Sequence, residues 1–313
     1  MRKTGLILLG ALALLLCGCR SPKTDRAQIV FAVLRGPSAL ALEKLGGAPG
    51  VSFIILDEPL RMRQLMLEGD VDFAVLPTAM AATMYNKGAQ YALCAVPLWG
   101  SLHLCGRDST VRSLQDLRGG RLFVPGRGLT AEILFRHLLT ANGMDPDKDL
   151  ELDYRFPGHI ALANAAIASK VDFALLPEPF ASQVLGADPE MHPLLDISAL
   201  WAETEGCPLP ETALLCRKSL PAENPERFSA IMSACRESER WVLSHPDSAA
   251  ALAVQMGINP DKTAVENCIP RSNMRFTPAE AAVQDLEHYL KTLYLCEPSS
   301  TGGALPDEDW IVK

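Results

Sequence analysis

Side chains that can hold a small ligand recur where strand-like segments end and helix-like segments begin. The free N–H groups and partial positive charge of a helix N-terminus suit an anionic or polar group. In open α/β sheets, ligands bind beyond the carboxyl ends of the strands. The candidate ligand-binding residues at such turns are Gly36, Pro37, Ser38, Pro77, Thr78, Trp99, Gly100, Ser101, Gly126, Arg127, Gly128, Thr130, His159 and Glu178. We therefore expect these turns to bind a small polar or anionic molecule.

Arg127 is the candidate with the most specific chemistry, because it stands between Gly126 and Gly128. A guanidinium can bind a carboxylate, sulfonate or phosphate through two parallel hydrogen bonds. The alternative is an exposed arginine in a solvated turn. The loop lacks the lysine of a nucleotide-binding P-loop, so we do not interpret it as a nucleotide motif.

Four other candidates each admit a structural interpretation as well. Glu178 can bind an amine or ring nitrogen, or can place a favourable charge at a helix N-terminus. Trp99 can form a cleft wall or ordinary packing. His159 can line the pocket, or lie on the surface or in the core. Thr130 is placed to cap the helix that follows it.

Patterns typical of catalysis are absent from the sequence. It has neither a Gly-x-Ser-x-Gly elbow nor a His-Glu-x-x-His motif, and its six histidines lack metal-ligand spacing. We therefore expect no catalytic residue, no metal and no cofactor, and a protein that is not an enzyme.

A near-identical repeat organises the chain. Residues 71–77 read Val-Asp-Phe-Ala-Val-Leu-Pro, and residues 171–177 differ from them at one position only. A hundred-residue spacing is too long for a solenoid unit. The repeat instead indicates two α/β lobes that face each other, with the copies diverging at Thr78 and Glu178.

The elements around these residues alternate between strand-like and helix-like segments. Apolar runs predict strands at 29–34, 51–56, 72–76, 92–96, 101–105, 121–124, 150–154, 172–176 and 211–216. Helices are expected between them, and only helices beyond residue 216, at 225–243, 246–256, 260–268 and 278–295. This pattern predicts an α/β fold with two doubly wound, parallel-sheet lobes joined by a two-crossover hinge. We expect lobe 1 at 28–107 and 207–313, and lobe 2 at 108–206.

The overall composition is that of a folded globular protein, with 48% hydrophobic and 21% charged residues. The formal net charge is −8, aromatic residues make up only 6%, and there is no basic block. These properties argue against nucleic-acid binding.

The N-terminus is typical of an exported lipoprotein. A short basic start precedes an apolar run, Leu6–Leu16, that is too short to span a bilayer comfortably. Leu16-Cys17-Gly18-Cys19 resembles a bacterial lipobox with Cys19 as the lipidated residue. We expect a signal peptide at 1–18, a flexible tether at 19–27, and a lipid anchor on the cell membrane facing the periplasm or exterior. The alternative is a plain signal anchor with incidental cysteines.

Seven cysteines follow Cys19, so at least one must stay free or pair between chains. No Cys-x-x-Cys spacing occurs, which argues against zinc. Buried free thiols are the favoured interpretation. The alternative is a set of disulfides, with Cys94–Cys105 or Cys207–Cys216 as the first pairs to test.

Several segments together resemble type II periplasmic substrate-binding proteins. Residues 113–122, Ser-Leu-x-Asp-Leu-x-Gly-x-x-Leu, are similar to a Ser-Leu-x-Asp-Leu-Lys-Gly-Lys-x-Ile segment of that group. The nearest branch resembles the SsuA/THI5-like lipoproteins, which bind sulfonates, nitrate, taurine or thiamine precursors for ABC importers. Further segments similar to this branch are 69–78, 84–88, 142–149, 176–180 and 302–309.

This resemblance implies a type II periplasmic-binding-protein fold, in which two lobes close on a small ligand. It also implies delivery of that ligand to an ABC permease and its ATPase, by a protein expected to be a monomer. The same fold serves menaquinone-pathway enzymes of the MqnA type, which are cytoplasmic, and a pyrimidine synthase with a cysteine-rich iron motif that this chain lacks. A tethered ligand sensor is a third alternative.

Overall fold

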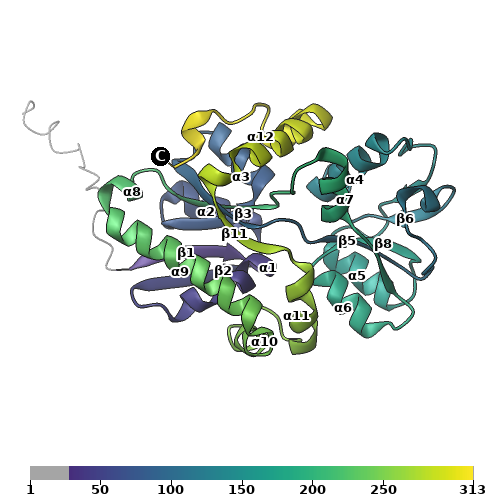
Figure 1. Cartoon of the computed structure of the whole chain (residues 1–313), viewed down its shortest axis with the longest axis horizontal. Coiled ribbons are helices and arrows are strands. Elements are labelled where there is room, and N and C mark those ends of the chain that lie inside the picture. Colours follow the sequence, from purple (N-terminus) through teal and green to yellow (C-terminus); the bar gives the residue numbers. More distant parts are fainter. Residues whose placement is uncertain (1–27, 313) are drawn as a thin grey trace, which may run out of the picture.

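The computed structural model describes residues 28–312, which form two α/β lobes lying side by side (Figure 1). The expected signal peptide, Cys19 and the expected tether lie outside the described residues. Between residues 28 and 312, no helix is long and apolar enough to cross a membrane.

The first lobe is built on a six-stranded sheet with the order β11-β4-β10-β3-β1-β2. Strand β1 pairs in parallel with β2 and β3, whereas β10 runs antiparallel between β3 and β4. The strands are β1 (Ile29–Leu34), β2 (Val51–Leu56), β3 (Phe73–Pro77), β4 (Tyr91–Leu98), β10 (Thr212–Arg217) and β11 (Met274–Pro278).

The second lobe is built on a five-stranded sheet with the order β7-β6-β8-β5-β9. Strand β6 pairs in parallel with β7 and β8, whereas β5 runs antiparallel between β8 and β9. The strands are β5 (Leu102–Gly106), β6 (Arg121–Phe123), β7 (Glu151–Asp153), β8 (Phe173–Pro177) and β9 (His192–Asp196).

Helices cover both sheets. On the first lobe they are α1 (Pro37–Ala41), α2 (Pro59–Glu68), α3 (Thr78–Asn86), α8 (Leu220–Glu223), α9 (Pro225–Ser244), α10 (Pro246–Gln255), α11 (Lys262–Cys268) and α12 (Ala279–Cys296). On the second they are α4 (Thr130–Ala141), α5 (His159–Ile167), α6 (Phe180–Ala187) and α7 (Ile197–Glu205). The start of α9 shows why helices begin where they do, because Asn224 caps it through the Arg227 N–H and Pro225 fills the first turn.

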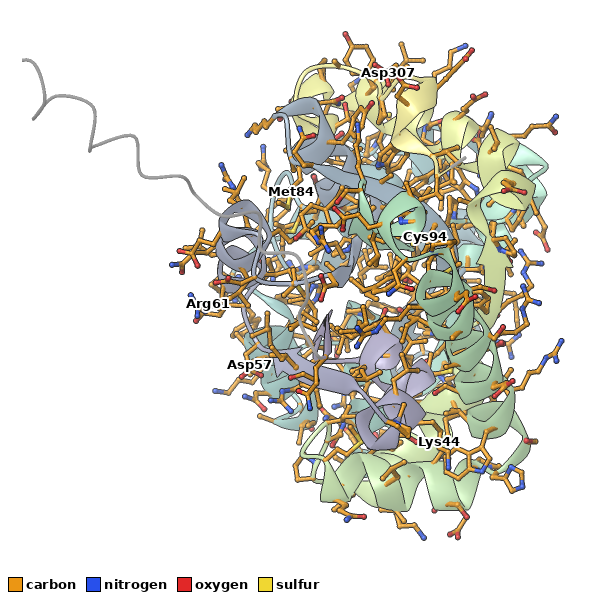
Figure 2. All side chains as sticks on the ribbon, turned by 90° about the vertical axis from the view of Figure 1, so that its left-hand side faces the viewer. Lys44, Asp57, Arg61, Met84, Cys94 and Asp307 are labelled. Carbon is orange, nitrogen blue, oxygen red and sulfur yellow. The ribbon has the colours of Figure 1, made fainter. Side chains whose placement is uncertain are left out.

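Alternate residues of the first sheet supply two separate cores. Phe31 and Val33 point to the face covered by α1 and α9, while Ala32 points to the face covered by α2, α3 and α12. Figure 2 views this lobe from its outer end, with Asp57 toward the edge of the molecule and Cys94 among the interior side chains. Both faces are buried, which explains the unbroken apolar runs in the sequence.

The predicted α/β fold with two sheets is confirmed, and both sheets are mixed, with parallel and antiparallel pairs. The strands at the crossings between lobes, β5 and β10, each return antiparallel and insert into a sheet. The boundary expected after residue 107 is wrong for β5, because β5 pairs with β8 and β9 in the second sheet.

Three elements differ from the expectation further along the chain. The region beyond residue 216 is not all helical, since β11 pairs with β4. Its residues Met274, Arg275 and Phe276 alternate buried, exposed and buried, the period of a strand. Strand β9 and helix α7 were not anticipated, because the short segment His192–Asp196 mixes apolar and polar residues without a clear period.

The seven thiols of the described chain are free in this structure. Five of them are buried, whereas Cys207 is half-buried and Cys296 is exposed. Cys94 lies in β4 of one sheet and Cys105 in β5 of the other.

Candidate functional site

The first copy of the repeat ends at a buried hydroxyl. Strand β3 stops at Pro77, and the Thr78 N–H donates to the Glu211 carbonyl oxygen at 2.9 Å. Thr212 pairs with Pro77 in the antiparallel register, so Glu211 lies opposite Thr78. Thr78 is fully buried. Lobe 1 therefore places one hydroxyl and one carboxyl side by side at this strand end.

The second copy repeats this backbone arrangement with the two side-chain types exchanged. Strand β8 stops at Pro177, and the Glu178 N–H donates to the Ser101 carbonyl oxygen at 2.8 Å. Leu102 pairs with Pro177, so Ser101 lies opposite Glu178. Both side chains are buried. In lobe 2 the carboxyl follows the repeat strand, and the hydroxyl stands on the returning strand.

The two strand ends meet across the crossing between lobes. The Ser101 hydroxyl donates to Glu211 Oε1 at 2.9 Å, which joins the two pairs into one buried group. We call Thr78, Ser101, Glu178 and Glu211 the seam. Three of these residues were predicted from the sequence, and the structure brings those three together.

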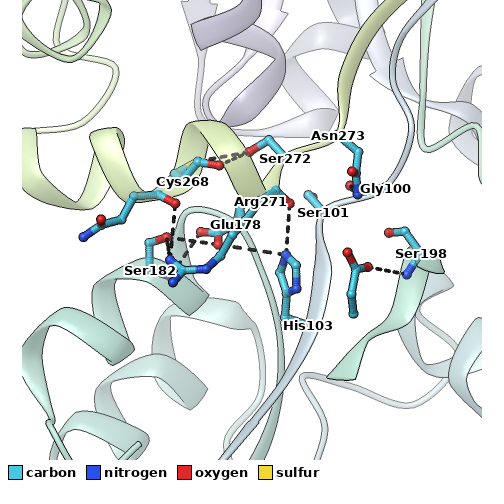
Figure 3. A network of polar contacts seen from close by, with 12 residues as sticks. Gly100, Ser101, His103, Glu178, Ser182, Ser198, Cys268, Arg271, Ser272 and Asn273 are labelled. Carbon is cyan, nitrogen blue, oxygen red and sulfur yellow. Dashed lines mark hydrogen bonds and ion pairs between the residues drawn. The ribbon is translucent and has the colours of Figure 1, made fainter. Parts of the chain in front are cut away.

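Glu178 is hydrogen-bonded to Ser182 of α6, and Ser182 also accepts from a cation of the other lobe (Figure 3). Its two carboxyl oxygens accept from the Ser182 N–H at 3.1 Å and the Ser182 hydroxyl at 3.0 Å. Arg271 of lobe 1 donates to the Ser182 hydroxyl at 3.1 Å. The Arg271 carbonyl oxygen lies 3.0 Å from His103 Nε2. Lobe 1 thus reaches Glu178 through Arg271.

Burial sets the protonation of both seam carboxyls. It raises the pKa of Glu178 to about 7, although hydrogen bonds from Ser182 and the charge of Arg271 act in the opposite direction. Burial also raises the pKa of Glu211 to about 7 against the hydrogen bonds from Ser101. Both groups therefore titrate near neutral pH, so a ligand can readily change their charge.

The remaining turns predicted around the seam are close to it. Ser38, which follows Gly36 and Pro37 at the start of α1, has its hydroxyl 3.4 Å from that of Thr212. The His159 ring stacks on Phe180 at 5.8 Å, and burial lowers its pKa.

The crossing itself depends on Trp99 and Gly100. The Trp99 indole N–H donates to the Arg275 carbonyl oxygen at 2.9 Å, and the Arg275 guanidinium lies 4.3 Å from the ring centre. Gly100 has φ of 106°, and a Cβ there would overlap the Ser198 side chain. Trp99 packs at this point, and only glycine fits at position 100.

The glycine loop holds its arginine against an aromatic ring of lobe 2. The Arg127 side chain is exposed, and its guanidinium lies 4.7 Å from the centre of the Tyr154 ring. The Gly128 N–H donates to Glu132, and Glu132 also accepts from the Tyr154 hydroxyl. The expectation that Thr130 caps α4 is wrong, because the N-cap residue is Leu129 and Thr130 is the first residue of the helix.

A cavity of about 600 Å³ connects the glycine loop to lobe 1. It is lined from α2 and α3 on one side and from the loop before α4 on the other. Its lining includes the predicted residues Pro77, Gly128 and Thr130. A larger groove of about 800 Å³ is lined by α12 and the C-terminal segment, but all its lining residues belong to lobe 1.

A second contact between the lobes surrounds Glu205 of α7. Its two carboxyl oxygens each lie 2.7 Å from a histidine Nε2, that of His137 on α4 and that of His288 on α12. Trp201 packs against both imidazole rings. Among residues 28–312, no group of three or more metal-ligating side chains could hold a metal ion.

Sequence reasoning missed the partners of the predicted residues. Glu211 is the first residue of the strand predicted at 211–216, but its pairing opposite the first repeat leaves no sequence signal. Ser182 stands four residues after Glu178, within reach on one helical turn. Arg271 falls between the helices expected at 260–268 and 278–295, and we find no sequence signal for it.

Comparison with known proteins places the chain in a family. The family model described as NMT1/THI5 like matches residues 51–249. A curated relative, the nitrate/nitrite binding protein NrtA of Nostoc, is 25% identical over 135 residues. That match covers 43% of this chain and 29% of the relative, so the chain spans less than a third of the relative's length.

Solved structures support the same assignment. An ABC transporter structure from Parabacteroides distasonis has a TM-score of 0.80 and 27% identity, over 92% of this chain and 99% of that one. The periplasmic aliphatic sulphonate binding protein SsuA of Escherichia coli has a TM-score of 0.71 and 15% identity, over 92% and 93%. The latter likeness shows the shared periplasmic-binding-protein fold, and the similarities together support a solute-binding role. The chain therefore belongs to the NMT1/THI5-like family.

Proposed function

We propose that this protein captures a small polar ligand between its two lobes outside the cytoplasm and delivers it to an ABC importer. The observation that carries the proposal is the seam, where each lobe contributes one buried hydroxyl and one carboxyl with a buried oxygen at a strand end. In α/β folds this edge is where ligands bind. Two chain crossings beside it supply a hinge about which the lobes can open and close.

In this proposal, closure follows the differential affinity of the ligand for the closed form. The ligand contacts Thr78 on lobe 1 and Glu178 on lobe 2, so it binds fully only when both strand ends approach. The cavity between α2, α3 and the glycine loop offers room for an apolar part of the ligand. A lipid on Cys19 would hold the closed protein near a membrane permease.

The names of similar proteins suggest anionic ligands, and the place of Arg127 bears on that choice. The curated relative is named for nitrate and nitrite, and the Escherichia coli protein for aliphatic sulphonates. Arg127 was the sequence candidate for such an anion, and it lies outside the seam. We therefore propose Arg127 as an outer contact at most, and place the main recognition at the seam.

Thermal unfolding in the presence of sulfonates, aminopyrimidines and aromatic carboxylates tests this proposal, because a ligand of the native state raises the Tm. Glu178→Gln and Thr78→Val should remove most of the shift produced by an active compound. Glu151→Gln, an exposed carboxyl paired with Arg121, is the matched control and should leave the shift unchanged. If the seam variants retain the full shift, the seam is not the binding site.

A second measurement, on any compound that raises the Tm, separates a binding protein from an enzyme of this fold. A carboxyl with a pKa near 7 beside a polar ligand could also transfer protons. We propose binding without turnover, so the bound compound should be recovered chemically unchanged after prolonged incubation, as measured by mass spectrometry. A converted product would favour an enzyme.

A further inference from the structure

Two side-chain oxygens on the lobe 1 side of the seam are buried without a partner. Within residues 28–312, Glu211 Oε2 and the Thr78 hydroxyl oxygen make no hydrogen bond, although Glu211 Oε1 accepts from Ser101. Leaving a buried polar group unpaired is unfavourable, because the group loses its hydrogen bonds to water and gains none in return. Such atoms in a native protein therefore call for a partner that arrives from outside the chain.

The lobe 2 side of the seam differs in this respect. Both carboxyl oxygens of Glu178 accept hydrogen bonds from Ser182. The hydroxyl of Ser101 is engaged by Glu211. The free hydrogen-bonding capacity of the seam therefore lies on Thr78 and Glu211.

These two residues are placed to contact one ligand group together. The Thr78 N–H bonds the Glu211 carbonyl oxygen at 2.9 Å, so the residues oppose each other at the end of an antiparallel pair. Opposed side chains in such pairs have Cβ atoms about 4.5–5.5 Å apart. A carboxyl oxygen and a hydroxyl at that spacing can both accept from a single amino group.

We infer that Glu211 and Thr78 form a subsite for a hydrogen-bond-donating nitrogen of the ligand, as in an amine, an amidine or an amino-substituted heterocycle. This inference rests on the proposed function and names the chemistry of its ligand.

The charges around the seam agree with this chemistry. Arg271 is the guanidinium that reaches the seam, and it is already engaged by the Ser182 hydroxyl and the Asn267 carbonyl oxygen. A small anion without N–H groups would meet two carboxyls there and could not satisfy Glu211 Oε2. A ligand nitrogen, in contrast, would donate to the carboxyl and gain a charge-assisted hydrogen bond.

Matched probe pairs test the inference by titration calorimetry on the purified chain. Each pair shares its shape, but only one member carries the donor: taurine with propane-1-sulfonate, benzamidine with benzoate, and 4-aminopyrimidine with pyrimidine. We expect the donor-bearing member of at least one pair to bind tenfold tighter or more. Glu211→Gln and Thr78→Val should each reduce that ratio about tenfold, while Arg127→Ala should leave it unchanged. Circular dichroism and urea unfolding confirm that each variant is folded.

The outcomes separate this inference from the proposed function. If no donor-bearing probe binds more tightly than its partner, the inference is overturned. If propane-1-sulfonate or benzoate binds and Glu178→Gln abolishes that binding while Glu211→Gln does not, the inference fails but the solute-binding proposal stands. If no probe binds at all, both are contradicted.

Discussion

The two copies of the repeat end in the same backbone hydrogen-bond arrangement, but their side chains differ in how many hydrogen-bond partners they find. In each lobe, the residue after the repeat strand donates its N–H to the residue that opens the antiparallel neighbour, Thr78 to Glu211 and Glu178 to Ser101. Lobe 2 then completes its hydrogen bonds internally through Ser182, whereas lobe 1 leaves two oxygens unpaired. Equal backbone arrangements therefore give one strand end whose carboxyl is paired within its own lobe and one that keeps two unpaired oxygens.

The crossings that lead into these strand ends also differ. One passes through Gly100 with a positive φ of 106°, directly before Ser101. The other passes through Pro210, directly before Glu211. Proline fixes its own φ, while the glycine is required by the close approach of Ser198. The first crossing is therefore the more sensitive of the two to substitution.

The largest effect is expected from Gly100→Ala, which would disturb the crossing that leads directly into Ser101. The added methyl group overlaps Ser198, and the backbone conformation is unfavourable for alanine. We expect a loss of about 3 kcal/mol of unfolding free energy, from overpacking and backbone strain together. Urea unfolding followed by circular dichroism measures it.

Gly119→Ala is the matched control for that variant. Gly119 has φ of 75°, but a Cβ there would meet no atom within 4 Å. We expect a loss of about 1 kcal/mol, because only the backbone preference is violated. Equal losses in the two variants would show that the approach of Ser198 contributes nothing.

Glu178→Gln and Glu211→Gln should each change how the unfolding free energy depends on pH. Below about pH 4.5 each carboxyl is protonated in both the folded and the unfolded chain. Between that pH and about 7 the folded protein keeps a proton that the unfolded chain has released, so this carboxyl lowers stability as pH rises. Glutamine does not titrate. The unfolding free energy of the native protein minus that of each variant should therefore fall by roughly 2–3 kcal/mol between pH 4.5 and pH 8.

The two glutamine variants should nevertheless differ from each other at pH 5. Glutamine at 178 keeps its oxygen toward the Ser182 N–H only if its NH₂ group turns to the Ser182 hydroxyl, which must then accept instead of donating, a rearrangement that costs about 1 kcal/mol. Glutamine at 211 can keep its oxygen toward Ser101 and place its NH₂ group at the unpaired position. Urea unfolding at pH 5 should find the variant at 211 the more stable. The opposite order would mean that Glu178 is not the better-satisfied carboxyl.

Glu205, at the other contact between the lobes, has a pKa shifted in the opposite direction from those of Glu178 and Glu211, and Glu205→Gln tests its effect on stability. Burial raises the pKa of Glu205, but hydrogen bonds from His137 and His288 outweigh it and hold the pKa below its ordinary value. Its contribution to stability is therefore present above the unfolded pKa and lost as pH falls through the lower, folded pKa. We expect a loss of about 1–2 kcal/mol at pH 7 that shrinks toward pH 3. A difference that grows on acidification would contradict this assignment.

The sequence predicted much of the fold because burial leaves a strong pattern. β1 and β2 match their predicted bounds, since each is a continuous apolar run. β11 was missed because its segment is short and lies among helices. The antiparallel insertion of β5 and β10 was missed because direction leaves no trace in an apolar run.

The candidate site was predicted in part for a related reason. Thr78, Ser101 and Glu178 stand next to strand ends, which the apolar pattern locates. Glu211 and Arg271 belong to the site through pairing and packing between distant segments, and such contacts are invisible in a single sequence. The glycine loop with Arg127 drew attention by composition alone, and in the structure the Arg127 guanidinium lies over the Tyr154 ring.

The smallest effect is expected from removing one hydroxyl on each side of the seam. Ser182→Ala and Ser101→Ala each delete a donor to a buried carboxyl, Glu178 in one case and Glu211 in the other. We expect about 1 kcal/mol from each loss, and an upward movement of the carboxyl pKa because a hydrogen bond to the charged form disappears. Each carboxyl keeps a backbone donor, because the Ser182 N–H remains for Glu178 and the Ser101 N–H remains for Glu211. Carbon-13 NMR titration of the carboxyl groups should therefore show upward movements of similar size, and a much larger movement for one carboxyl would mean that the two ends of the repeat depend differently on their hydroxyl donors.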